Sequence, residues 1–381
     1  MSMKILHVSD THLGYSAYRK STEDGINQRE KDVYNSFEQF VDYAVKTKPD
    51  LIIHAGDLFD SVRPNNRSIT FSIRQLLRLS KEKIPVIIIA GNHEHPKLRE
   101  TGHIFSIFDH LENVYPIYNA KYETLDFKIK NKKIMIHAIP QCNSKKEFDE
   151  ELKKLKPNKD FDYNIFVTHG AITGIKEFSM NEFNELIITK NVLKKDFDYI
   201  ALGHYHKYTE LAKNIFYSGA MESLTFSDAN EKKGFIELKL KDGKLEHNFI
   251  QIKTRPMVDT KPIKCSDLKL DEIMKKIKQT ISEINPKEKT FRITLEDIPS
   301  SVYRGLDFNQ IKKLGGDAVH YEIKAKVVKE ESAKPTTTSK INALVNEFKQ
   351  FLEHQDLKEK ETILELGIGY IEKIEAREEG K

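Results

Sequence analysis

The stretch AGNHEHPK, residues 90–97, decides how this chain is interpreted. It continues the apolar run PVIIIA, residues 85–90, which leads into a glycine and is typical of a buried strand. An amide, a carboxylate and two imidazoles follow at once, in Asn92, His93, Glu94 and His95. Open α/β sheets bind their ligands beyond the carboxyl ends of strands. The stretch therefore indicates an α/β fold with a binding site at the end of this strand.

Strand-like and helix-like segments alternate around this stretch. Other short apolar runs, which we expect to be buried strands, are found at residues 3–8, 51–55, 133–139, 164–168 and 198–202. Residues 32–46 and 68–81 carry apolar side chains three and four positions apart, as amphipathic helices do. This alternation predicts an α/β core, and shorter strands expected at 214–218, 233–240 and 245–252 make its sheet mixed.

Composition limits the classes of protein to consider. The chain has 381 residues, 39% of them hydrophobic and 31% charged, and two or three domains are expected at this length. The sequence has no run of 18 apolar residues and no secretion-type leader, so we expect no membrane span and a cytoplasmic location. Two distant cysteines, Cys142 and Cys265, exclude a disulfide framework. The net charge of +4 neither shows nor excludes nucleic-acid binding.

The chain is expected to divide into four segments. Residues 1–255 form the α/β core, and 256–328 have the pattern of a small α+β domain. Residues 329–340 are polar and rich in Thr, Ser and Lys, so we interpret them as a linker. Residues 341–381 carry two amphipathic helices, which either dock on the body or bind a partner. The candidate partner-binding residues are Leu344, Phe348, Phe351, Leu352, Ile363 and Ile371.

Five of the expected strands end in side chains that can bind metals. These candidate ligands are Asp10, His12, Asp57, Asn92, His169, His204 and His206. Each motif alone is weak evidence, because an Asp or His after a strand often only forms a turn. In extended chain, residues two positions apart project on one side, so Asp10 with His12, and His204 with His206, can point at one site. By contrast His7, His54 and His137 are embedded in apolar runs and are interpreted as structural.

The number and type of these ligands predict a reaction class. Seven ligands are too many for one metal with open positions and suit two metals that share a carboxylate. Oxygen and nitrogen donors without cysteine favour Mn²⁺, Fe or Zn. Two such metals activate water and neutralise phosphate oxygens, which predicts phosphoester hydrolysis. His93 adjoins Asn92 and is the candidate catalytic residue, placed to protonate or steady the leaving oxygen.

Longer motifs carry a resemblance to a known family. The short motifs DTH, GD, GNH, TH and GHYH resemble those of the calcineurin-like metallophosphoesterases, and the match is narrowed by the segments DTHLGY (10–15), AGDLFDSVRP (55–64), GNHEHP (91–96), LGHYHK (202–207) and IKTRPMVD (252–259). Within this family the segments resemble the nuclease subunits of DNA double-strand-break repair complexes, which are SbcD-like proteins of archaeal and eukaryotic type. The resemblance is strong over residues 3–260. It implies two mixed sheets flanked by helices, a small capping domain near the DNA, and a C-terminal helical pair that binds a coiled-coil ABC-type ATPase.

The resemblance also implies roles for individual residues. One metal would be bound by Asp10, His12, Asp57 and His206, and the other by Asp57, Asn92, His169 and His204. His93 would act in the transition state. Members are typically homodimers with two Mn²⁺ ions, and their dimer helices would fall near residues 68–81 and 100–112. They cleave duplex ends as 3′-to-5′ exonucleases and single strands as endonucleases.

Two positions depart from the family pattern. Asp60 stands where many members have a histidine that is tied to processing of duplex DNA, and Glu94 stands where many have an aspartate. Two other functions are compatible with the core motifs. One is a general metallophosphoesterase that acts on nucleotides or phosphoproteins, and the other is a scaffold that has lost its metals. The complete ligand set argues against the scaffold.

Overall fold

The structure is a computed structural model that describes residues 2–172, 185–189, 191–328, 345, 348–349, 352 and 360–378. The chain forms two compact units. The first unit comprises Met1–Ile263, Asp271–Leu295 and Asp307–Lys324. The second unit comprises Lys264–Leu270, Glu296–Leu306 and Ala325–Lys381.

A six-stranded sheet begins the first unit, in the order β14-β13-β1-β2-β3-β4. Its strands are β1 (Met3–Val8), β2 (Leu51–His54), β3 (Val86–Ile89), β4 (Val114–Ile117), β13 (Gly234–Lys241) and β14 (Lys244–Gln251). The strands β1 to β4 are parallel, whereas β13 is antiparallel to both β1 and β14. The carboxyl ends of β1, β2 and β3 therefore meet at one edge of the sheet.

A second six-stranded sheet has the order β11-β12-β10-β7-β6-β5. Its strands are β5 (Glu123–Ile129), β6 (Lys132–Ile139), β7 (Tyr163–His169), β10 (Tyr199–Gly203), β11 (Thr209–Ala212) and β12 (Ile215–Tyr217). The four inner strands are parallel, and the two edge strands run antiparallel to them. Both sheets are mixed, as the sequence predicts.

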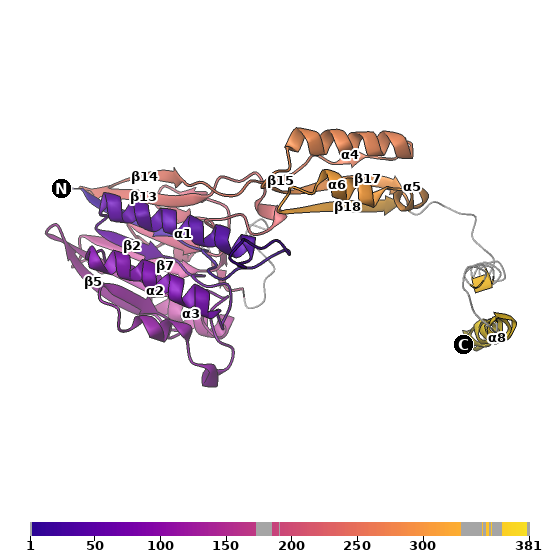
Figure 1. Ribbon diagram of the computed structural model, residues 1–381. Helices are drawn as coiled ribbons and strands as arrows, with labels where there is room; N and C mark the ends of the chain where they lie inside the picture. The colour runs from indigo at the N-terminus through magenta and orange to yellow at the C-terminus, as the bar shows by residue number, and fades with distance from the viewer. Residues whose placement is uncertain are drawn as a thin grey trace. The chain divides into compact units, whose positions relative to one another are not determined.

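Helices cover the outer faces of the two sheets, which makes four layers (Figure 1). Helices α1 (Gln28–Thr47) and α2 (Asn66–Lys81) lie side by side on the first sheet, and α3 (Lys145–Lys154) packs on the second. Between the sheets lie fully buried side chains such as Ile53 and Ile165. Because each sheet is buried on both faces, its inner strands are continuous apolar runs rather than alternating ones.

The helices begin where capping residues provide acceptors. The Asn27 side chain accepts the backbone N–H groups of Arg29 and Glu30 at the start of α1, and Asn65 accepts that of Ser68 in α2. Such caps satisfy N–H groups that have no partner within the helix. The caps place the starts of both helices a few residues earlier than hydrophobic periodicity alone indicates.

The segment after residue 255 pairs into a smaller sheet. Strand β17 (Thr290–Pro299) pairs with β15 (Met257–Asp259), β16 (Ile263–Lys264) and β18 (His320–Val328). The helices of this segment are α4 (Leu270–Ile284), α5 (Ser300–Arg304) and α6 (Phe308–Leu314). Shorter elements of the chain are β8 (Ala171–Ile172), β9 (Ile187–Ile188), and the 3₁₀ helices η1 (Arg99–Thr101), η2 (Ile104–Phe108), η4 (Val192–Lys194) and η5 (Phe226–Asp228).

Two 3₁₀ segments, η1 and η2, occupy the region where a dimer helix over residues 100–112 is expected, so that expected helix is wrong. Gly102 between them has a positive φ of 68°, which interrupts helical geometry. Phe105 and Phe108 are fully buried, with ring centroids 6.4 and 6.1 Å from that of Phe59. Their side chains therefore fill the core.

Part of the expected C-terminal helical pair is described. Helix α8 (Lys360–Glu378) carries Ile363 and Ile371, while Leu344 and Phe351 lie outside the described residues. Leu352 is buried, and the ring of Phe348 lies where a Cβ on Gly367 would be 2.1 Å from it. Phe348 therefore packs directly on the backbone of α8. No helix in the described part of the chain is both long enough and apolar enough to span a bilayer.

Candidate metal centre

The first cluster of candidate ligands lies at the ends of β1 and β10. One ligand atom each from Asp10, His12 and His206 lies within 4.8 Å of the other two, and all three residues are buried. The Nε2 atom of His12 is buried and has no hydrogen-bond partner among the described residues. Buried polar atoms are rarely left without a partner in native proteins. The unsatisfied Nε2 atom of His12 therefore fits a divalent metal bound by this cluster.

The second cluster lies at the ends of β2, β7 and β10. Asp57, His169 and His204 also bring one ligand atom each within 4.8 Å of one another. The amide oxygen of Asn92 joins them, at 3.0 Å from His169 Nε2 and 3.2 Å from His204 Nδ1. These oxygen and nitrogen donors are of the type that Mn²⁺, Fe and Zn accept.

Asp57 lies between the two clusters. Its Oδ2 atom is 3.1 Å from His169 Nε2 in the second cluster and 3.9 Å from His12 Nε2 in the first. A carboxylate in this position can bridge two cations. All seven residues singled out from the sequence are thus brought together at one end of the two sheets.

The backbone at the site adopts conformations that non-glycine residues rarely adopt. The φ angles are +52° at Asp10, +46° at His12, +55° at Asp57 and +103° at His204. Such conformations cost about 1–3 kcal/mol each and cluster at functional sites. Hydrogen bonds across the two loops hold them, because the N–H groups of Thr11 and His12 both donate to the Asp57 carbonyl, at 2.9 and 3.1 Å.

Two glycines allow the loops to come this close. A Cβ on Gly91 would lie 2.1 Å from Asp57 Oδ1, and a Cβ on Gly203 would lie 2.0 Å from the carbonyl oxygen of Ala55. Real Cβ atoms essentially never make contacts this short. The glycines of the GNH and GHYH motifs are therefore required by the close packing of neighbouring strand ends.

Hydrogen bonds orient the carboxylates. The His204 N–H donates to both oxygens of Asp10, at 3.0 and 3.1 Å, and the His93 N–H donates to Asp57 Oδ1 at 3.0 Å. Burial alone would raise the pKa of Asp57, but the imidazole of His169 holds that pKa well below its usual range. Burial alone would likewise lower the pKa of His169, and the Asp57 carboxylate instead raises it to about 9. The site thus favours a charged carboxylate between its histidines.

His93 lies beside the clusters and is more exposed than the candidate ligands. Its side chain is 27% exposed, against 1% for that of His12, and the two ring centroids are 4.6 Å apart. The Nδ1–H group donates to the carbonyl oxygen of Asp60 at 3.1 Å. Nε2 is then the nitrogen with which His93 can act on a substrate.

Four acidic residues surround the candidate ligands, and two of them, Glu185 and Asp228, were not indicated by the sequence. Glu94 is buried and its Oε1 accepts the Gly91 N–H at 2.9 Å, while burial, reinforced by the Asp57 charge, raises its pKa to about 8. The carboxylate of Asp60 lies 3.2 Å from His12 Nδ1. Glu185 and Asp228 lie beside His204 and His206 respectively. The last two are remote from the motifs in sequence, so no spacing could have indicated them.

The histidines interpreted as structural are buried and hydrogen-bonded. His7 Nδ1 is 2.8 Å from the Tyr199 hydroxyl, and His54 Nε2 is 3.0 Å from that of Thr11. His137 contacts the side chains of Tyr122 and Asn164. His95, which had no assigned role, contacts the Asn143 amide oxygen at 3.2 Å.

Comparison with known proteins defines the class. Residues 3–208, more than half of the chain, match the calcineurin-like phosphoesterases, and the chain belongs to this family. Its fold and its groups of metal-ligating side chains agree with that class of hydrolase.

Archaeal proteins named DNA double-strand break repair protein Mre11 are similar to the chain. The Sulfolobus acidocaldarius protein is 27% identical over 380 residues, which cover 94% of this chain and 93% of the relative. The Sulfurisphaera tokodaii protein is 37% identical over 206 residues, 53% of this chain and 49% of the relative. The Thermoplasma acidophilum protein is 28% identical over 263 residues, 66% of each. The resemblance expected from the motifs is confirmed.

Proposed function

We propose that this chain is a two-metal DNA nuclease that acts in double-strand-break repair. The observation that carries the proposal is the pair of ligand clusters with Asp57 between them, in a chain similar to one archaeal repair protein over nearly its full length. We propose Mn²⁺ as the metal, and both exonuclease activity on duplex ends and endonuclease activity on single strands.

The proposed reaction is hydrolysis of a phosphodiester. Asp10, His12, Asp57 and His206 would hold one metal, and Asp57, Asn92, His169 and His204 the other. Two divalent cations held there would supply the positive charge that activates a water molecule and neutralises a phosphate. The buried carboxylates and imidazoles fix the geometry in advance, because the hydrogen bonds of His204 N–H and His93 N–H already orient Asp10 and Asp57.

His93 would act on the oxygen that leaves. Its Nδ1–H donates to the Asp60 carbonyl, so we assign the contact with the substrate to Nε2. In its protonated form the ring can donate a proton, or a charge-assisted hydrogen bond, to the leaving oxygen. A positioned acid of this kind typically contributes about 10²–10⁴-fold to the rate.

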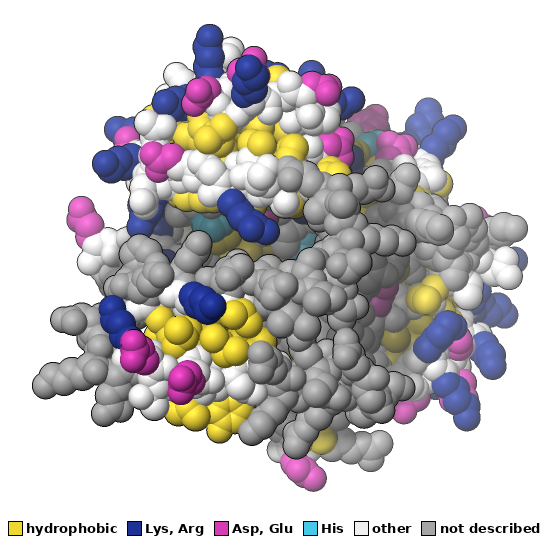
Figure 2. All heavy atoms as spheres, turned by 90° about the vertical axis from the view of Figure 1, so that its right-hand side faces the viewer, with side chains coloured by type: hydrophobic (Ala, Val, Ile, Leu, Met, Phe, Trp, Pro, Cys, Tyr) yellow, Lys and Arg dark blue, Asp and Glu magenta, His cyan; other side chains and the backbone are white. Residues whose placement is uncertain are grey.

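We further propose two protein partners, a second copy of this chain and a coiled-coil ABC-type ATPase. Leu366 and Tyr370 of α8 are 60% and 66% exposed, which leaves apolar surface for a helical partner. The DNA surface is not assigned to single residues. Figure 2 shows lysine and arginine side chains together with acidic ones among the described residues of the face in view.

Cleavage assays test the proposed function. An end-labelled duplex and a single-stranded circle are each incubated with the protein in Mn²⁺, Mg²⁺ or EDTA. We expect Mn²⁺-dependent cleavage of both substrates, lost in His93→Ser although that variant still binds two Mn²⁺ ions. His110→Ser, a change at an exposed histidine, is the matched control and should cleave normally. Turnover of small phosphate esters without DNA cleavage would contradict the proposal and favour a general phosphoesterase.

A further inference from the structure

The two histidines of the GHYH motif each face a carboxylate on the side away from the metal ligands. His204 Nε2 lies 2.7 Å from Glu185 Oε1, while its Nδ1 faces Asn92 in the second cluster. His206 Nδ1 lies 3.7 Å from Asp228 Oδ2, within ion-pair range. Metal-binding histidines generally present their second ring nitrogen to a carboxylate or carbonyl, which fixes the tautomer and the ring orientation.

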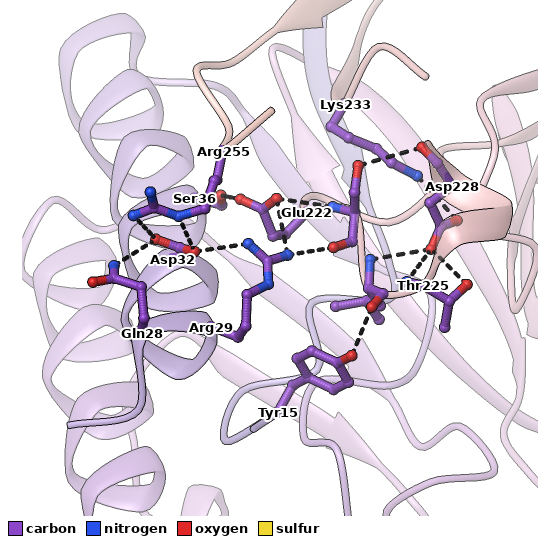
Figure 3. Close-up of polar contacts among 12 residues, drawn as sticks. Tyr15, Gln28, Arg29, Asp32, Ser36, Glu222, Thr225, Asp228, Lys233 and Arg255 are labelled. Carbon is purple, nitrogen blue, oxygen red and sulfur yellow. Dashed lines mark hydrogen bonds and ion pairs between the residues drawn. The ribbon is translucent and has the colours of Figure 1, made fainter. Parts of the chain in front are cut away.

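Asp228 is held firmly in this position. It ends η5 and is buried, and its Oδ2 accepts the backbone N–H groups of Leu224 and Thr225, at 3.1 and 3.0 Å (Figure 3). The other oxygen, Oδ1, lies 3.3 Å from Lys233 Nζ. The carboxylate therefore has a fixed orientation before any metal binds.

Lys233 contacts both Asp228 and the backbone of His206. Its side chain is buried, and Nζ donates to the carbonyl oxygen of His206 at 2.9 Å as well as to Asp228. A buried lysine is costly unless its charge is paired and its protons are hydrogen-bonded. Here one ammonium group fixes both the main chain of His206 and the carboxylate that faces its ring.

A wider buried network supports the same loop (Figure 3). Arg29 of α1 is fully buried and donates to the Ser223 carbonyl, to Asp32 Oδ2 at 2.7 Å and to Glu222 Oε1 at 3.3 Å. Arg255 donates a hydrogen bond to the same aspartate, from its NH2 group to Asp32 Oδ1 at 2.9 Å. The loop that carries Asp228 is thus anchored to helix α1 through the buried Arg29 side chain, which pairs with Asp32 and Glu222.

From this geometry we propose that Asp228, held by Lys233, is a positioning residue that aims His206 at one metal, and that Glu185 does the same for His204 at the other. The proposal rests on the proposed function only in that both metal sites are occupied. Neither carboxylate touches the substrate. Glu185 keeps the proton of His204 on Nε2, so that Nδ1 is left with a lone pair for the metal, whereas Asp228 orients the His206 ring through its charge at 3.7 Å.

Mn²⁺ binding without DNA provides the test. Isothermal titration of the purified protein with MnCl₂ is run on the unmodified chain, Asp228→Asn and Glu185→Gln, with circular dichroism to establish folding. We expect each substitution to lower the affinity of one Mn²⁺ site by about 10–100-fold, as is typical when a ligand loses such a partner. The affinity of the other site should stay unchanged. The double substitution should lower the Mn²⁺ affinity of both sites.

Asp198→Asn is the matched control. The Asp198 carboxylate also accepts a backbone N–H, that of Asn164 at 2.7 Å, but it precedes β10 and so lies at the opposite end of the strand from His204. We expect both Mn²⁺ affinities to be unchanged in this variant. Asp228→Glu, which keeps the charge, should recover part of the affinity that Asp228→Asn loses.

If a folded Asp228→Asn or Glu185→Gln protein binds Mn²⁺ at both sites as tightly as the unmodified chain does, the proposal is overturned. Should Asp228→Asn not fold, Glu185→Gln decides, because Glu185 is 11% exposed and is not part of the buried charge network described above. Failure of the proposed function has a different signature, namely an unmodified chain that binds two Mn²⁺ ions and cleaves no DNA.

Discussion

The substitution Gly91→Ala should disable the metal centre through a single methyl group. The new Cβ would lie 2.1 Å from Asp57 Oδ1, 2.5 Å from the Asp57 backbone nitrogen and 2.7 Å from Cγ. To reach an ordinary van der Waals separation, Asp57 and Gly91 must move apart by about 1 Å. The overlap includes backbone, so a change of side-chain rotamer cannot relieve it.

A displacement of this size is large for a shared metal ligand. Metal–ligand distances are held within about 0.2 Å, and a misplacement of about 1 Å at a reacting centre costs roughly 10²-fold in rate. We therefore expect Gly91→Ala to lose at least one Mn²⁺ ion in a titration and to cleave DNA about 10²-fold more slowly or worse. Strain from overpacking should also reduce the free energy of unfolding by about 1–3 kcal/mol.

Gly369→Ala makes the same chemical change in open space, since nothing lies within 4 Å of a Cβ built there. This helical site should tolerate alanine, with unfolding free energy unchanged or raised by up to about 1 kcal/mol. If Gly91→Ala binds two Mn²⁺ ions with normal affinity, the reasoning is refuted. The position of Asp57 would then not depend on its close contact with Gly91.

Three other changes have distinct expected outcomes. Arg29→Met should lower the free energy of unfolding, measured by urea titration, by about 3–5 kcal/mol, because Glu222 loses its buried cation. Arg78→Met, at an exposed pair with Asp42, should change that free energy by less than about 0.5 kcal/mol. Equal effects would show that burial of the network is unimportant. Asp60→His should raise degradation of duplex ends relative to single strands, since Asp60 lies 3.2 Å from His12 and 3.9 Å from His93; an unchanged ratio would make the position neutral. Deletion of residues 330–381 should preserve cleavage and weaken binding to the ATPase partner in a pull-down, and unchanged binding would assign the tail to the body of the protein.

The core of the fold and the grouping of the candidate ligands were predictable because each depends on local sequence. Fully buried strands are continuous apolar runs, and the residues directly after them necessarily meet at one edge of a parallel sheet. Asp57 and Asn92 lie at one edge for this reason, because they follow β2 and β3, which are neighbouring parallel strands of the first sheet. The edge strand β5 was not predicted, because its alternating, half-exposed side chains give a weaker signal.

The residues that support the ligands could not be predicted in the same way. Arg29 contacts Glu222 across 193 positions, and His204 contacts Glu185 across 19, with no periodicity that links either pair. Their contacts follow from how complete loops pack on the sheets. The α-helix expected at 100–112 is replaced by η1 and η2, because Gly102 between them has a positive φ of 68°.

The central claim is that two metals share Asp57, and anomalous scattering from a crystal soaked in MnCl₂ tests it most directly. The account predicts two manganese peaks about 3.5–4 Å apart, one on each side of the Asp57 carboxylate. One peak should adjoin Asp10, His12 and His206, and the other Asn92, His169 and His204. A single peak, or a pair that does not include Asp57, would contradict the account.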